Sequence, residues 1–169
     1  MTDLMKELEE AFQKTKNELK FKATLEEIDG VFFIRDFIAE KKFVSSHFSR
    51  QLAGRITDLY SGVVGFLHNL LVPNPQSMPS ITEHQAFSEE ERGAIMQLMN
   101  RIMAFTSQNW LIGLAKDKAL EAKYIDESLE LWHKHVKPKT IELMRTINAS
   151  WKEKAEKAPP KQRQEHAYG

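Results

Sequence analysis

The sequence predicts an all-α fold, a compact up-and-down bundle of four principal helices with one or two peripheral helices and one long crossover loop. Apolar residues recur at three- and four-residue steps along most of the chain, the spacing that gathers them on one face of a helix. No segment alternates apolar and polar residues between hairpin turns, and only 7 glycines are spread over the 169 residues. The sequence therefore does not predict a β-sheet.

Residues 46–72 carry the longest run of helical spacing and predict the central helix. Its main apolar stripe consists of Phe48, Leu52, Ile56, Leu59, Val63, Leu67 and Leu70. A neighbouring face of the same helix carries small and polar residues, namely Gly54, Asp58, Ser61 and Gly65. The helix should end before Pro73, because a residue that precedes proline is biased away from helical dihedral angles.

Two helices are predicted before the central one. Residues 2–21 form an amphipathic pattern whose apolar stripe is interrupted near Thr15, which indicates a peripheral helix. In the second helix, residues 24–38, Thr24 and Glu27 have the spacing of a capping box. Apolar residues then cover more than half of its circumference, so this helix is expected near the centre of the bundle.

Residues 73–87 contain three prolines among polar residues and predict a long loop, which is either a crossover along the bundle or a functional lid. Ser88 and Glu91 then form a second capping box and open a long helix. Its apolar pattern weakens before Asn109, which predicts a kink or a break there. Trp110, Trp132 and Trp151 are spaced as members of apolar stripes, so all three are expected first in the core and next at an interface.

The C-terminal part of the chain predicts a helix from Tyr124 onward, for which Asp126 is a plausible cap. Pro138 interrupts the pattern and predicts a kink or a fresh start. The last helix is expected to reach about Lys157. Residues 1–157 are therefore assigned to a single helical-bundle domain, and residues 158–169 to a disordered tail.

Composition disfavours several classes of function. Lys plus Arg and Asp plus Glu number 24 each, so the chain has no global field that would attract nucleic acid or an anionic membrane. The absence of cysteine excludes thiolate chemistry and Cys-ligated metals. The N-terminus lacks the apolar core of a signal peptide, and the most apolar window, residues 59–72, is too short to span a bilayer. A cytoplasmic protein with neither a membrane nor a nucleic-acid partner is expected.

Glu130 and His133 are the only candidates for a metal site, and they are weak ones. Their Glu-x-x-His spacing is used by di-metal sites in helical bundles, but those sites require a second such pair. The sequence contains none. The basic neighbours Lys134 and His135 favour a solvated helix face, so no cofactor and no metal are predicted.

Charged residues on the two helices expected to be most buried form a second candidate site, consisting of Arg35, Arg50, Arg55 and Asp58. Buried charges usually pair or bind something. One interpretation is ion pairing between helices, for example Arg35 with Asp58 or Asp36 with Arg55. The other is a small anionic ligand held between the helices at residues 24–38 and 46–72, since arginine suits carboxylate and phosphate.

The leading hypothesis for function is a non-enzymatic interaction or assembly module that self-associates, because no catalytic motif is present. Gly54, Ser61 and Gly65 would let another helix approach closely, either within the chain or in a homo-oligomer. The alternative hypothesis is a bundle enzyme or carrier for an anionic nucleotide-like or cofactor ligand. The helix order resembles ferritin-like proteins and corrinoid adenosyltransferases, and this analogy of fold carries no function.

Overall fold

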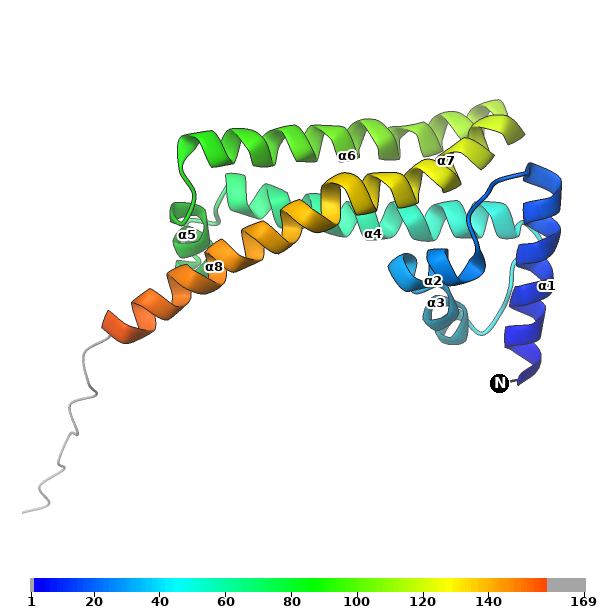
Figure 1. Cartoon of the computed structure of the whole chain (residues 1–169), viewed down its shortest axis with the longest axis horizontal. Helices are drawn as coiled ribbons and strands as arrows, with labels where there is room; N and C mark the ends of the chain where they lie inside the picture. The colour runs from blue at the N-terminus through cyan, green and yellow to red at the C-terminus, as the bar shows by residue number, and fades with distance from the viewer. Residues whose placement is uncertain (1, 158–169) are drawn as a thin grey trace, which may run out of the picture.

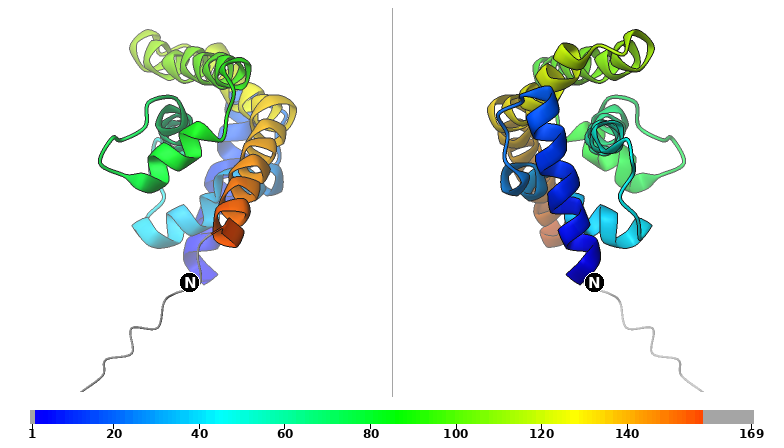
Figure 2. Two further views of the ribbon diagram at one scale, coloured as in Figure 1. Left: turned by 90° about the vertical axis from the view of Figure 1, so that its left-hand side faces the viewer. Right: turned by 90° about the vertical axis from the view of Figure 1, so that its right-hand side faces the viewer.

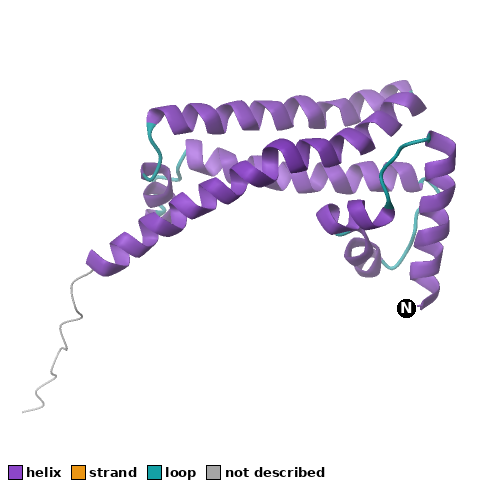
Figure 3. Ribbon diagram, in the orientation of Figure 1, coloured by secondary structure: helices purple, strands orange, loops and turns teal. Residues whose placement is uncertain are grey.

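Long helices run beside one another for most of the length of the molecule, and shorter helices close its two ends (Figure 1). The computed structural model describes residues 2–157 of the chain, and within them every regular element is helical (Figure 3). The predicted all-α helical bundle is therefore confirmed. The predicted tail, residues 158–169, lies outside the described residues.

Three long rods form the body of the bundle. They are α4 (Phe48–Leu71), α6 (Glu89–Ala115) and the rod in which α7 (Lys118–Leu131) continues through a π-helical turn (Trp132–Val136) into α8 (Lys137–Lys157). Viewed along their length, the rods occupy different corners of the molecule (Figure 2). α4 and α6 are antiparallel neighbours with the most extensive mutual contacts of any two elements.

The remaining helices close the ends of the rods. α1 (Thr2–Leu19) crosses one end and contacts α3, α4 and α7, while α2 (Leu25–Phe32) and α3 (Ile34–Lys41) fill the corner beside it. α5 (Met78–Gln85) lies at the other end, between α4 and α8. Since α5 lies within residues 73–87, that segment is a helical crossover rather than the loop that its prolines predict. Pro79 sits in the first turn of α5, where a missing N–H is tolerated.

The predicted helix at residues 24–38 is broken at Phe33, which adopts the left-handed conformation with φ 51°. The capping box of Thr24 and Glu27 is present as predicted. One straight helix could not turn so wide an apolar surface toward a single core. The break redirects the chain, so that Phe32 and Ile34 on either side of it are both fully buried and Phe33 is exposed.

Two further boundaries differ from those that the sequence predicts. α6 continues unbroken through Asn109, whose side chain points into a polar network instead of the apolar core. α7 begins earlier than predicted, capped by Asp117 rather than Asp126. The Asp126 carboxylate instead accepts hydrogen bonds from the backbone N–H groups of Lys22 and Ala23 at 2.9–3.0 Å. It thereby ties α7 to the segment between α1 and α2.

The irregularity expected at Pro138 is a π-helical turn immediately before it. The N–H of Lys137 donates to the carbonyl of Trp132, five residues back. A proline inside a helix lacks an N–H and its ring clashes with the preceding turn, and the wider π turn accommodates both effects. α8 therefore continues from α7 as one rod (Figure 1).

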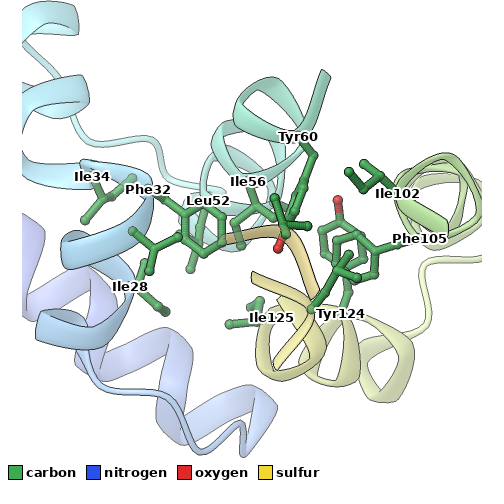
Figure 4. Packing of buried hydrophobic residues seen from close by; sticks show 14 of the residues in the cluster. Ile28, Phe32, Ile34, Leu52, Ile56, Tyr60, Ile102, Phe105, Tyr124 and Ile125 are labelled. Atoms are coloured by element: carbon green, nitrogen blue, oxygen red, sulfur yellow. The ribbon is translucent and has the colours of Figure 1, made fainter. Parts of the chain in front are cut away.

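Aromatic rings occupy the centre of the core, where α2, α4, α6 and α7 meet (Figure 4). The rings of Phe105 and Tyr124 are stacked with centroids 4.4 Å apart. Tyr60 packs edge-on against Phe105 at 5.3 Å and tilted against Phe32 at 6.0 Å. These contacts join four helices, α2, α4, α6 and α7, and they fix how the rods lie against one another.

Candidate functional site

Large apolar side chains are exposed along one face of α6. Trp110 is 77% exposed, Leu114 81% and Met103 51%, and Met96 lies on the same face. The steps between these four residues are seven, seven and four, so they form one line along the helix. We call Met96, Met103, Trp110 and Leu114 the α6 stripe. A line of large exposed apolar residues is unusual on the surface of a monomer.

The small face of α4 lies beside the α6 stripe. The side chain of Asn109 donates to Thr57 at 2.8 Å, and the rings of Tyr60 and Phe105 touch, so these contacts fix the antiparallel register of α4 and α6. In this register Ser61 is level with residues 104 and 105. Arg50, one turn before Gly54 on this face, lines a cavity together with Trp110 and Leu114.

The glycines on this face are not required for packing within the chain. A Cβ atom added at Gly54 or Gly65 would meet no heavy atom within 4 Å, and Ser61 and Gly65 are exposed. No other helix among residues 2–157 therefore makes the close approach that these small residues would permit. The α6 stripe forms a ridge. Next to it lies an open shallow strip, the small face of α4, in which the exposed Asp58 lies between Gly54 and the pair Ser61 and Gly65.

The cavity between the two helices has a volume of about 350 Å³. Its lining residues are Arg50, Asn109, Trp110, Gly113 and Leu114. Gly113 makes room for the guanidinium, because a Cβ there would lie 3.3 Å from Nη2 of Arg50. The floor of the cavity is thus polar, and its outer walls are apolar.

An ion pair between the partly exposed Arg50 and a buried carboxylate lies at the back of this cavity. Nη1 of Arg50 is 3.7 Å from Oε1 of Glu121, a residue that is only 8% exposed. Neither atom has a hydrogen-bond partner within the described residues, and Nη2 of Arg50 donates to the carbonyl of Asn109 at 3.4 Å. The pair therefore joins α4 to α7 through charge alone, at a site where an unpaired charge would be costly.

Thr57 is the centre of a short chain of hydrogen bonds next to this pair. Its hydroxyl donates to the carbonyl of Ala53 at 2.8 Å, and it accepts from the side-chain amide of Asn109. Since the only hydroxyl proton of Thr57 is used, the hydroxyl of Tyr124, 2.8 Å away, must be the donor in their contact. The chain links α4, α6 and α7 at Asn109, the residue before the exposed Trp110.

Burial raises the pKa of Tyr124 to about 12, and burial also raises the pKa of Tyr60. An unfolded tyrosine loses its proton near pH 10. The stability that these raised pKa values contribute is therefore fully present below about pH 10. The free energy of unfolding is expected to fall as the pH rises from about 10 to 12, because the unfolded chain releases these protons first. Ultraviolet titration of tyrosinate in a Tyr168→Phe variant, beside circular dichroism, checks this, because that variant retains only Tyr60 and Tyr124: both tyrosines should ionise only as helicity is lost. Ionisation near pH 10 in a fully helical protein would contradict it.

The structure does not bring the predicted arginines together. Arg35 bonds to Asp29 at 2.9 Å and to Glu26 at 3.2 Å, and these carboxylates raise the pKa of Arg35. Nε of Arg55 donates to the carbonyl of Phe32 at 2.7 Å, at the end of α2. Arg50 lies on a different side of α4 from Arg55, since residues five positions apart are separated by about 140°.

The two ion pairs offered as examples are not those that form. Arg35 pairs with Asp29, within the corner between α2 and α3, instead of with Asp58. Asp58 is exposed on the outside of α4, while Arg55 lies over the ring of Phe37, with its guanidinium carbon 5.5 Å from the ring centroid. The break at Phe33 explains the difference, because it turns Arg35 back toward α2.

Glu130 and His133 are both exposed, and Glu130 bonds to Lys134 at 2.5 Å. This hydrogen bond lowers the pKa of Glu130. Among residues 2–157, no group of three or more His, Asp or Glu side chains is arranged to hold a metal ion. Glu130 and His133 therefore lie on a solvated helix face beside the π turn.

Trp110 is placed wrongly by the sequence prediction, since its helical spacing predicts the core first and it is largely exposed. Trp132 does pack against the core, 6.4 Å from the ring of Tyr60, and Trp151 is partly exposed on α8. The signal that could have identified Trp110 is the seven-residue spacing from Met96 and Met103, which runs beside the buried stripe of α6. Two apolar stripes on one helix indicate two contacts.

Fold and site together define an all-α helical bundle with an exposed apolar ridge. Comparison of the chain with models of protein families, with curated proteins and with solved structures finds no match. Within residues 2–157, no helix is long and apolar enough to cross a membrane.

Proposed function

We propose that this protein is an interaction module that self-associates through the α6 stripe and the small face of α4. The observation that carries the proposal is the exposure of Trp110 and Leu114, which are 77% and 81% accessible to solvent. Burying large apolar side chains is worth about 1.5–3 kcal/mol each. These side chains do not contribute that free energy to folding, because they stay in water. Burial against a partner would make it available for binding.

The composition of the surface supports a protein partner. Trp, Met and Arg are enriched at the cores of protein interfaces, and Trp and Arg are the commonest residues at which binding energy is concentrated. Here Trp110 and Arg50 line the same cavity, with Met103 further along the stripe.

The shape of the surface supports a second copy of the chain as that partner. A two-fold dimer uses the same patch on both subunits, so the patch must complement itself. A ridge of large residues next to a strip of small ones meets this requirement, since the ridge of each copy can lie on the strip of the other. Gly54 and Gly65 leave the strip open.

Replacing both Trp110 and Leu114 by glutamate should abolish self-association. Sedimentation velocity over a range of concentrations measures it: the native chain should shift toward a dimer as concentration rises, and the double variant should stay monomeric. Phe43→Glu is the matched control, because Phe43 is also exposed but lies between α3 and α4, away from the stripe.

The proposal would be overturned by a native chain that stays monomeric at the highest concentration. It would equally be overturned by a double variant that associates as the native chain does. Because both substituted residues are exposed, the variant should keep its helical circular dichroism, and this measurement accompanies the sedimentation runs.

A further inference from the structure

A groove lies between α6 and the π-helical turn, and Arg101 and His135 form its centre. Two adjoining cavities of about 410 and 350 Å³ share these two residues in their linings. Leu98 and Pro138 contribute carbon surface to the first cavity, and Phe105 contributes to the second. Volumes of this size lie at the lower end of small-molecule sites.

Of the basic residues that line the groove, the two lysines form ion pairs within the described part of the chain and the arginine does not. Lys134 bonds to Glu130 at 2.5 Å and Lys139 to Glu142 at 2.6 Å, so each lysine has its own carboxylate. Arg101 forms no ion pair among residues 2–157, and its Nη1 lies 2.7 Å from Nε2 of His135. The centre of the groove therefore holds a guanidinium whose nearest polar neighbour is an imidazole rather than a carboxylate.

We propose that this groove binds a small phosphorylated molecule that carries a compact apolar or aromatic group. A phosphate beside Arg101 could accept two parallel hydrogen bonds from the guanidinium, the geometry in which arginine binds phosphate best. Nε2 of His135 can accept from Arg101, and the N–H at Nδ1 of the neutral imidazole would be a further donor to the same anion. The apolar group would lie against Leu98 in one cavity or Phe105 in the other.

The backbone holds the two central residues in place before any ligand binds. Arg101 is adjacent to Ile102, which is fully buried, and α6 is continuous on both sides of it. His135 belongs to the π-helical turn that precedes Pro138. π turns of this kind occur often at functional sites, and here the proline that favours the turn also lines the groove.

This site is separate from the proposed self-association surface. Arg101 and Met103 are two positions apart on α6, so their side chains point about 200° apart around the helix axis. Met103 belongs to the α6 stripe, whereas Arg101 faces the rod formed by α7 and α8. Phosphate binding and dimer formation can therefore be tested independently.

Isothermal titration calorimetry of the full chain with phenyl phosphate tests the inference. Phenyl phosphate should give saturable binding, inorganic phosphate weaker binding, and phenol none. Arg101→Gln should weaken binding of phenyl phosphate at least tenfold. Arg145→Gln is the matched control and should change nothing, because Arg145 is an exposed arginine of α8 that lines neither cavity.

Absence of saturable binding by phenyl phosphate would overturn the inference, as would equal affinity in the native chain and Arg101→Gln. Phenol binding as tightly as phenyl phosphate would also overturn it, since the site would then be apolar only. His135→Asn is the second variant in case Arg101→Gln melts at a lower temperature. It should also weaken phenyl phosphate binding, and unchanged affinity in this variant would overturn the inference, since His135 lines both cavities.

Discussion

Phe105→Ala should destabilise the protein by about 3–5 kcal/mol, the range measured for removing a buried aromatic ring. Phe105 is buried, its ring is stacked on Tyr124 at 4.4 Å, and Tyr60 packs against its edge (Figure 4). Removing the ring leaves a cavity where α4, α6 and α7 meet, and it also removes two aromatic contacts. Urea unfolding followed by circular dichroism measures the loss.

Phe43→Ala is the matched control for this prediction. Phe43 is 55% exposed, and substitutions at exposed positions usually change stability by less than about 0.5 kcal/mol. Comparable losses in the two variants would mean that the aromatic cluster is not the centre of the core.

Arg50→Met should destabilise the protein by about 3 kcal/mol, because it leaves the nearly buried carboxylate of Glu121 without a counter-charge. This is the lower end of the usual cost of breaking a buried pair, since Arg50 itself is partly exposed. Adding Glu121→Leu should restore most of the lost stability, as replacing both charges with apolar groups of similar size is often neutral. Urea unfolding of the two single variants and the double variant gives the coupling energy.

Lys123→Met is the control for the Arg50 variant, because it breaks a solvent-exposed ion pair on α7, the helix that also carries Glu121. Lys123 and Glu127 are 3.5 Å apart on α7, and both are exposed to solvent or partly so. Breaking such a pair should cost less than about 1 kcal/mol. A double variant at Arg50 and Glu121 that is no more stable than Arg50→Met would show that Glu121 is not held by the arginine.

Several helix boundaries follow from the sequence alone because their causes are local. Thr24 caps α2 and Ser88 caps α6. Each forms a capping box with the glutamate three residues later, as the sequence predicts. α4 ends at Leu71, two residues before Pro73, since proline restricts the residue that precedes it. Each signal acts within one turn of backbone, so no knowledge of the remaining chain is needed.

Other features depend on what packs against each segment. The chain breaks at Phe33, where local propensity favours a helix, because the break lets both Phe32 and Ile34 reach the core. It does not break at Asn109, where the apolar pattern weakens, because the amide of Asn109 has a partner in Thr57 from another helix. Long-range partners outweigh the local pattern in both places.

The same division applies to the candidate sites. The sequence by itself determined that Gly54, Ser61 and Gly65 share one face of the central helix, and the spacing of Met96, Met103 and Trp110 on α6 is a second signal of the same kind that was missed. Periodicity tells which residues share a face, since it depends only on helical geometry. Only the tertiary structure decided that these two faces lie side by side and uncovered, and that Arg101 meets His135, because which faces are buried depends on how the helices pack.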